Sequence, residues 1–241
     1  MNTLRILCFN IHGGYDTKGH RDLRRVHTLM DELDVDIGVF QEMETRPSRG
    51  GTAEDVDILC GSERPHHLPG PTMKEGKGWY GNLLVSRYPI KRAVVHDLEK
   101  KHQVLEPRNA VDALIDTPLG HIRIVGTHLS LSSFMRWWEI QNLIKLVNKL
   151  EDEAKCPVLF MGDFNEWFWA SKLIKHLDEL MTPLPSGKTF PSLYPIFRLD
   201  RVWCDNLNSP VRAEILNRPH IKTLSDHLPV LIEIEKPMEK A

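Results

Sequence analysis

The chain has 241 residues, of which 41% are hydrophobic and 27% charged, a composition that excludes disordered, collagen-like and membrane-spanning proteins. Its 31 basic and 33 acidic residues give a net charge of −2 at pH 7. The chain as a whole therefore lacks the basic field with which proteins bind nucleic acids without sequence preference. The four cysteines lie far apart and form no Cys-x-x-Cys pair, which disfavours a zinc ribbon or a disulfide framework and indicates a reducing compartment.

The N-terminal part of the chain is predicted to contain a strand, a helix and a second strand. Residues 4–9 form an apolar run, typical of a buried strand, which ends at Asn10 and turns polar too soon for a signal peptide. Apolar residues recur at helical spacing over 21–33 and predict a helix. The buried strand predicted over 35–41 then carries Glu42 at its end.

The rest of the chain is predicted to be richer in strands than in helices. Residues 47–77 contain many glycines, prolines, histidines and charged residues, so we expect a loop with one short element there. No internal repeat or low-complexity segment is present, so residues 1–241 are expected to form one domain, a mixed α/β sandwich. The predicted strands are residues 81–86, 93–98, 110–116, 122–127, 157–161, 201–204, 211–216 and 228–234, and the predicted helices are residues 133–151 and 171–179.

Polar side chains suited to chemistry follow the predicted strands one after another. Mg²⁺ needs oxygen ligands and keeps several waters, so Glu42, Asp226 and the amide oxygen of Asn10 fit the role of its ligands. Asp163 and Asn165 are two residues apart on an extended turn and can point the same way. The strand-end residues are Asn10, Glu42, His128, Asp163, Asn165, Asp200, Asp226 and His227.

Taken singly, each of these residues also has an ordinary structural explanation. Residues 163–165 could form a turn that caps the next helix, and residues 226–227 could form a strand-entry turn. His128 could be a hydrogen-bonded structural histidine, and Glu42 a surface acid. These explanations weaken when all of them have to hold together.

Seven motifs in this order resemble those of the endonuclease/exonuclease/phosphatase superfamily, which includes pancreatic-type deoxyribonucleases, sphingomyelinases, inositol-polyphosphate 5-phosphatases and deadenylases. The resemblance extends from Asn10 to about Ile234. It implies an α+β fold, a four-layer α/β/β/α sandwich of two packed mixed β-sheets flanked by helices, with the site at one edge of the sheets. The motifs are Asn10, Gln41-Glu42, the segment 81–87, Thr127-His128-Leu129, Gly162-Asp163-Phe164-Asn165, Leu199-Asp200-Arg201-Val202 and Ser225-Asp226-His227.

The resemblance also implies roles for the metal-binding and water-activating residues. Glu42 and Asn10 would be the principal Mg²⁺ ligands, with Asp226 assisting, and Mn²⁺ is the alternative cation. His227 would be the general base that activates water, oriented by Asp200.

The remaining roles concern the phosphate. His128 would be the acid or the electrostatic stabiliser on the opposite side of the phosphate. Asp163 and Asn165 would align the nucleophile and hold a non-bridging oxygen, and either Asp163 or His227 could take the proton. Arg108 matches a family arginine near the phosphate, an anion whose geometry suits a guanidinium.

Several further residues have both a substrate-side and a structural interpretation. Asn82 would line the phosphate pocket, or its amide would only hydrogen-bond the backbone at a strand start. His12 and Arg136 could face the substrate, although loop packing or a solvated helix start is the preferred interpretation for Arg136. Aromatic clusters could stack a base or meet a lipid head group, while core or rim packing is their more usual role. These clusters are residues 79–80, 137–138 and 167–169.

We therefore expect a Mg²⁺-dependent phosphoesterase that hydrolyses a small or lipid-derived phosphodiester by metal- and histidine-assisted in-line attack of water. A nuclease acting on DNA or RNA is the close alternative, disfavoured by the charge balance, and a non-catalytic phosphate-binding protein on the same fold is another. Zinc ligation by the 12 histidines is disfavoured because no His-Glu-x-x-His motif is present. The chain is most similar to small bacterial family members, and we expect a cytoplasmic protein without a transmembrane segment or an obligate protein partner.

Overall fold

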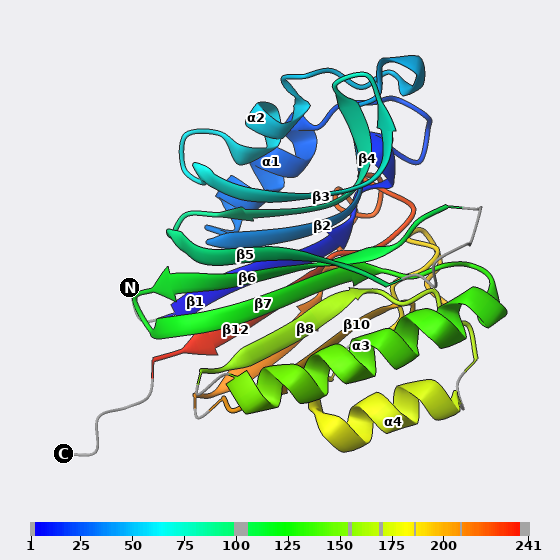
Figure 1. Ribbon diagram of the computed structural model, residues 1–241. Coiled ribbons are helices and arrows are strands. Elements are labelled where there is room, and N and C mark those ends of the chain that lie inside the picture. The colour runs from blue at the N-terminus through cyan, green and yellow to red at the C-terminus, as the bar shows by residue number, and fades with distance from the viewer. Residues whose placement is uncertain are drawn as a thin grey trace.

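In the computed structural model of the protein, the structure is described for residues 3–98, 106–153, 156–168, 171–185, 187–207 and 209–236. Two six-stranded β-sheets pack face to face in it. Helices α1 and α2 cover the outer face of one sheet, and helices α3 and α4 cover the outer face of the other (Figure 1). The expected α/β/β/α sandwich is confirmed.

The first sheet has the strand order β11-β12-β1-β2-β4-β3. Its two central strands, β1 and β2, are parallel, whereas the other neighbours in it are antiparallel. Its elements are β1 (Thr3–Asn10), β2 (Ile37–Glu44), β3 (His66–Glu75), β4 (Gly78–Ser86), β11 (Val211–Ile215) and β12 (Val230–Glu235), with helices α1 (Arg24–Glu32) and α2 (Asp55–Cys60) and 3-10 turns at His12–Gly14 and Pro47–Arg49.

The second sheet has the strand order β5-β6-β7-β8-β10-β9. Strands β7 and β8 are parallel, and the other neighbours are antiparallel. Its elements are β5 (Ile90–Asp97), β6 (Asn109–Thr117), β7 (Gly120–His128), β8 (Val158–Asp163), β9 (Thr182–Pro183) and β10 (Asp200–Asp205), with helices α3 (Ser133–Glu153) and α4 (Lys172–Leu180).

Strand β1 shows why the central strands are almost continuously apolar. Successive side chains of a strand point to opposite faces of its sheet. Leu4, Ile6 and Cys8 are therefore buried between the two sheets, whereas Leu7 and Phe9 are buried against the helices on the outer face. A strand covered on both faces needs apolar residues at both sets of positions, which is the pattern seen in the sequence.

The expectation of a loop over residues 47–77 is wrong. This stretch contains helix α2 and the ten-residue strand β3, which pairs with β4 at the edge of the first sheet. Pro69 and Pro71 obscure the strand in the sequence because proline has no N–H for the ladder. An edge strand tolerates proline since one of its sides faces no partner strand.

Two further expectations concern cysteines and the membrane. Cys8, Cys60, Cys156 and Cys204 are all free thiols, as expected, although Cys156 is only half-buried. In the part of the chain that the structure describes, no helix is both long and apolar enough to cross a bilayer.

Candidate active site

The pairing of the strands brings the predicted residues to one edge of the sandwich. In the first sheet Asn10 lies beside Gln41, the residue before Glu42. In the second sheet Asp163 lies between His128 on the parallel strand β7 and Asp200 on the antiparallel strand β10. The carboxyl ends of two parallel pairs, one in each sheet, therefore face each other at this edge.

Backbone irregularities aim the side chains at the ends of these strands. The pairing of β2 with β4 shifts between Phe40 and Met43, and Glu42 within this bulge has a φ of 60°. Such left-handed conformations cost about 1–3 kcal/mol for a residue other than glycine and tend to occur at functional sites. At Gly162, just before Asp163, a Cβ atom would lie 1.9 Å from the backbone oxygen of Thr127. Only glycine allows β8 to approach β7 this closely.

Asn10 connects the two sheets at the centre of the site. Its Nδ2 donates to Glu42 Oε1 and to Asp163 Oδ2, both at 3.0 Å, and its Oδ1 accepts from the backbone N–H of His12 at 3.1 Å. Burial, followed by the charge of Asp226, raises the pKa of Glu42. A carboxylate whose charged form is disfavoured in this way gains from a nearby cation.

This set of donors fits a hard divalent cation. Glu42 and Asp226 supply carboxylate oxygens, and the amide of Asn10 supplies an oxygen if its oxygen and nitrogen exchange places. These are the three predicted metal ligands.

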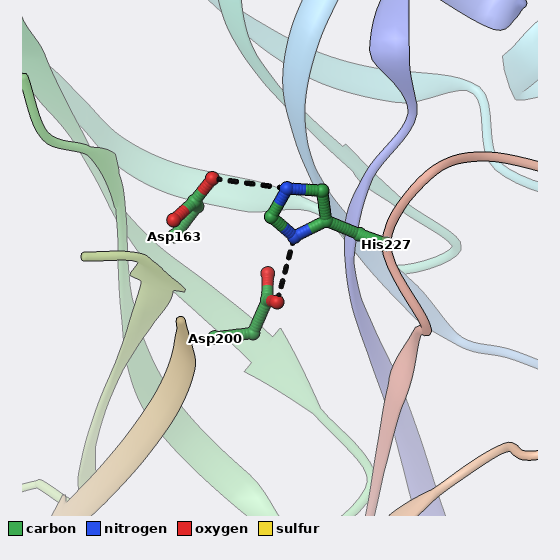
Figure 2. A group of neighbouring side chains, drawn as sticks. All are labelled: Asp163, Asp200 and His227. Atoms are coloured by element: carbon green, nitrogen blue, oxygen red, sulfur yellow. Dashed lines mark hydrogen bonds and ion pairs between the residues drawn. The ribbon is translucent and has the colours of Figure 1, made fainter. Parts of the chain in front are cut away.

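A second group, Asp163, Asp200 and His227, comes from β8, β10 and the loop before β12 (Figure 2). The Nδ1 of His227 lies 2.8 Å from Asp200 Oδ2, and its Nε2 lies 3.6 Å from Asp163 Oδ2. Although their ligand atoms lie within 4.8 Å of one another, we assign this group to proton transfer. A metal ion bound at Nδ1 would have to replace the hydrogen bond to Asp200.

The electrostatics of this group agree with that assignment. Burial disfavours the imidazolium of His227, but the charges of Asp200 and Asp163 outweigh burial and raise its pKa to about 10. Burial raises the pKa of Asp163 to about 6, against the opposing charge of His227. Without a cation, the pair formed by Asp163 and His227 therefore holds one proton at neutral pH.

His128 has the opposite electrostatic environment. Burial and the positive charge of Arg108 lower its pKa well below the usual value, so its ring is neutral at neutral pH. Its Nδ1 lies 3.4 Å from Nη1 of Arg108, and its Nε2 lies 3.1 Å from Nδ2 of Asn165. Asn165 is held by its backbone N–H, which donates to Asp163 at 2.9 Å, and by its Nδ2, which donates to the carbonyl of Leu129 at 2.8 Å.

These groups surround a cavity of about 220 Å³. Arg108 lines the cavity, and its buried Nε has no hydrogen-bond partner in the described residues. A buried guanidinium with an unused donor is suited to an anion. The lining residues are Glu42, Tyr80, Glu106, Arg108, His128, Leu131, Asp163, Asn165, Trp167, Phe190, Leu199, Asp226 and His227.

Asn82, predicted to line the phosphate pocket, lies outside the lining of this cavity. Its Nδ2 donates to the backbone oxygen and to Oδ1 of Asn109, at 3.1 and 2.9 Å. Asn109 directly follows Arg108, so this contact holds the strand that begins beside the arginine. The placement agrees with the structural interpretation of Asn82.

Arg136 and His12 are the two further candidates for facing the substrate. Arg136 is buried, and its Nη1 donates to the carbonyls of Ser130 and Leu131 at 2.9 Å, so loop packing is confirmed and a solvated helix start is wrong. His12 is half-exposed, with its Nδ1 3.6 Å from Asp226.

Sequence reasoning did not identify Phe190, whose ring centroid lies 4.9 Å from that of His227. It did single out residues 167–169. Trp167 lines the cavity and packs against Phe190 and Phe197, with ring centroids 5.5 and 4.8 Å apart, whereas Trp169 lies outside the described residues. The only signal for Phe190 was its position in a proline-containing loop before the Asp200 motif.

The fold and the site together define a class of protein. The family model of the Endonuclease/Exonuclease/phosphatase family matches residues 7–227, and the chain belongs to this family. Its members are phosphoesterase hydrolases that generally depend on a divalent metal.

Individual proteins show the same relationship. The chain is 28% identical over 248 residues to the uncharacterized protein YbhP of Escherichia coli, with 96% of each chain covered. An endonuclease/exonuclease/phosphatase structure from Beutenbergia cavernae superposes with a TM-score of 0.77 at 19% identity, covering 99% of this chain and 74% of the other. The Bacteroides thetaiotaomicron mannosyl-6-phosphatase Bt3783 superposes with a TM-score of 0.74 at 14% identity, covering 96% and 99%.

Proposed function

We propose that this protein is a Mg²⁺-dependent phosphodiesterase that hydrolyses a small or lipid-derived phosphodiester. The observation that carries the proposal is the convergence of Asn10, Glu42, Asp163 and His227 on one buried site beside a cavity that also exposes Arg108. The four free thiols fit the reducing cytoplasm. The whole chain, residues 1–241, is proposed to act as one domain, since both sheets contribute to the site.

The cation is assigned to Glu42, Asp226 and Asn10, with Mn²⁺ as an alternative to Mg²⁺. When bound there, it would neutralise charge on the phosphate and lower the pKa of nearby water. Glu42 is the ligand with the strongest support, because burial raises its pKa in the absence of a cation.

The other residues act on the phosphate and on the proton. The guanidinium of Arg108 binds a non-bridging oxygen. The Nε2 of the neutral His128 ring accepts from Nδ2 of Asn165, so its N–H is at Nδ1, beside Arg108, and donates to the phosphate on that side. Because the pKa of His128 is lowered, stabilisation of charge suits it better than the role of acid. His227 already holds a proton at neutral pH, so the proton of the attacking water goes to the carboxylate of Asp163. The Nε2 of His227 lies 3.6 Å from that carboxylate, and Asp200 orients His227 through Nδ1.

The surface around the cavity favours an amphiphilic substrate. Leu131 lines the cavity, and its side chain and that of Phe134 are each 68% exposed. Of the large exposed hydrophobic residues in the described chain, all except Val95 lie on three segments that are near the cavity residues in sequence. They are Leu131, Phe134 and Trp137, then Phe168, then Leu193, Tyr194 and Ile196. We propose that these groups form one apolar surface beside the cavity, since contiguous surfaces of this kind mark interaction sites.

The proposal is tested by assaying the purified protein with Mg²⁺ on bis-p-nitrophenyl phosphate, plasmid DNA, RNA and phospholipid vesicles. We expect turnover of the small ester and of the vesicle lipid, and loss of both in Glu42→Gln. Cleavage of DNA or RNA alone would establish a nuclease instead. Turnover of none of the four would favour a non-catalytic phosphate-binding protein.

A pair of matched variants tests the lipid part. Phe134→Ser should reduce turnover of vesicle lipid without changing turnover of bis-p-nitrophenyl phosphate. Val95→Ser removes an exposed hydrophobic residue of β5, which belongs to none of the three segments, and should change neither. Equal effects of the two substitutions on vesicle lipid would contradict a lipid substrate.

After treatment with EDTA, activity should return with Mg²⁺ or Mn²⁺ and not with Zn²⁺.

A further inference from the structure

A second cavity, of about 280 Å³, lies beside the catalytic cavity and shares Trp167 with it. Trp167 and Phe197 form part of its lining, and Lys188, Arg198 and Arg201 form another part. Three cationic side chains at one cavity contrast with the balanced charge of the whole chain.

Arg201 reaches this cavity because successive side chains of strand β10 point to opposite faces of the sheet. Asp200 faces the catalytic site, so the next side chain points to the opposite face of the sheet. Arg201 is only 8% exposed, and its Nε has no hydrogen-bond partner among the described residues. A buried cation without a hydrogen-bonded partner is costly unless an anion joins it.

The carboxylates that attract Arg201 are all engaged by other groups. Asp178 accepts a hydrogen bond of 2.7 Å from Nε1 of Trp203, and Asp200 is held by His227. Glu166, the third carboxylate, lines the cavity but has other partners.

Glu166 is bound at both of its oxygens. Its Oε2 accepts from the hydroxyl of Ser171 at 3.0 Å and lies 3.6 Å from Nε of Arg136, and its Oε1 accepts from the backbone N–H of Phe168 at 3.1 Å. Arg136 therefore compensates the charge of Glu166. Asp178 is then the carboxylate left to balance the charges of Arg198 and Arg201, so the lining keeps an excess of positive charge.

Arg198 also destabilises the charged form of Arg201. Burial, together with the charge of Arg198, lowers the pKa of Arg201 to about 10, and burial lowers the pKa of Arg198. Nη2 of Arg198 donates to the carbonyl of Leu184 at 3.3 Å. The negative charge of a phosphate group would stabilise both guanidinium cations. Its oxygens would also accept hydrogen bonds from their planar N–H donors.

We propose that the cavity lined by Arg198 and Arg201 is an anion-binding subsite that holds a second phosphate group of the substrate. This inference rests on the proposed function, since the phosphodiester itself would occupy the catalytic cavity on the other side of Trp167. The substrate class then becomes a phosphodiester that carries a further phosphate.

Calorimetric titration with inorganic phosphate tests the subsite independently of catalysis. The titration uses Arg108→Met, in which the catalytic cavity has lost its guanidinium, and Arg108→Met combined with Arg201→Met. We expect phosphate to bind to the first variant and to bind about tenfold or more weakly to the second, because charged hydrogen bonds are lost. Arg108→Met combined with Arg212→Met, which removes an exposed arginine on β11, is the control for net charge and should bind like Arg108→Met.

The melting temperature separates binding from a structural role. Replacing a buried cation that lacks a partner by an apolar side chain should leave the melting temperature of Arg201→Met equal to or above that of the wild type. Arg201→Lys, which keeps the charge, should retain part of the phosphate affinity. The subsite proposal is overturned if Arg108→Met combined with Arg201→Met binds phosphate as tightly as Arg108→Met alone. It is also overturned if Arg201→Met melts at a lower temperature than the wild type.

Kinetic measurements then show whether the cavity binds a second phosphate group of the substrate or only free phosphate. The substrates are the p-nitrophenyl ester of thymidine 5′-phosphate and the same ester carrying a 3′-phosphate. Arg201→Met should lower kcat/KM about tenfold for the 3′-phosphorylated ester alone. Equal kcat/KM for wild type and variant on both esters would mean that the cavity takes free phosphate, and would overturn the proposal. If the wild type cleaves neither ester, the proposed function fails, while the titration still decides on the subsite.

Discussion

The hydrogen bond between Asp200 and His227 can be tested by the conservative substitution Asp200→Asn. Without a cation, burial lowers the pKa of His227, but the charges of Asp200, Asp163 and Asp226 raise it from 6.5 to about 10. This difference corresponds to about 5 kcal/mol. Asp200 alone is within hydrogen-bond distance, at 2.8 Å. Its removal should therefore lower the pKa of His227 by roughly two pH units, or about 2–3 kcal/mol.

The effect on stability should depend on pH. A histidine whose pKa is raised by folding stabilises the protein fully below its unfolded pKa, near 6.5, and this stabilisation is lost as the pH rises towards 10. Asp200→Asn should lower the free energy of unfolding by about 2–3 kcal/mol at pH 6 and by much less near pH 10. Turnover should fall about 100-fold or more, because His227 loses the group that orients it.

The pKa is measured by an NMR titration of the imidazole resonances of His227 in EDTA-treated protein, and the stability by urea unfolding at both pH values. Asp205→Asn, at the other end of β10, changes the charge equally but lies far from the site along the strand and should leave the pKa of His227 unchanged. An unchanged pKa of His227 in Asp200→Asn, or an equal loss of stability at both pH values, would refute the electrostatic account of this pair.

Three other substitutions test the site and the sheet that supports it. Glu42→Gln should weaken Mg²⁺ binding in calorimetry without lowering the stability of the cation-free protein, since burial raises the pKa of this carboxyl; a clear loss of stability would contradict this account. Asp112→Asn should cost about 3–5 kcal/mol in urea unfolding at pH 7, because it removes the carboxylate that accepts two hydrogen bonds from the buried Arg123. The pKa of Asp112 is lowered by Arg123 although burial opposes it, so this difference should shrink as the pH falls below about 4, and Asp116→Asn on the same strand is the control. Gly162→Ala should cost about 3 kcal/mol or more in thermal or urea unfolding, because the added Cβ atom overlaps the backbone of β7, and a stable, active variant would show that the two strands can separate.

The predicted site residues were accessible to sequence reasoning because most of them lie at or next to an end of a buried strand. A strand covered on both faces is recognisable as an apolar run, and the first polar residue after it marks its end. Asn10 and Asp163 stand at such positions, and Glu42 and His128 each follow such a position by one residue. Parallel neighbours bring these strand ends to one edge of the sandwich. Local polarity and strand direction therefore determined which side chains could meet. The edge strand β3 was missed because its prolines hide the strand pattern.

Only the tertiary structure decided the electrostatic state of these groups. His128 and His227 both lie at an end of an apolar strand, yet their pKa values shift in opposite directions. Burial and then the charge of Arg108 lower the pKa of His128, whereas the charges of two carboxylates outweigh burial at His227. Likewise, Asp200 and Arg201 are consecutive, but the pleat of β10 turns one towards His227 and the other towards the basic cavity lined by Arg198 and Arg201. Burial and charge depend on segments far apart in the chain, and these come together only when the two sheets pack.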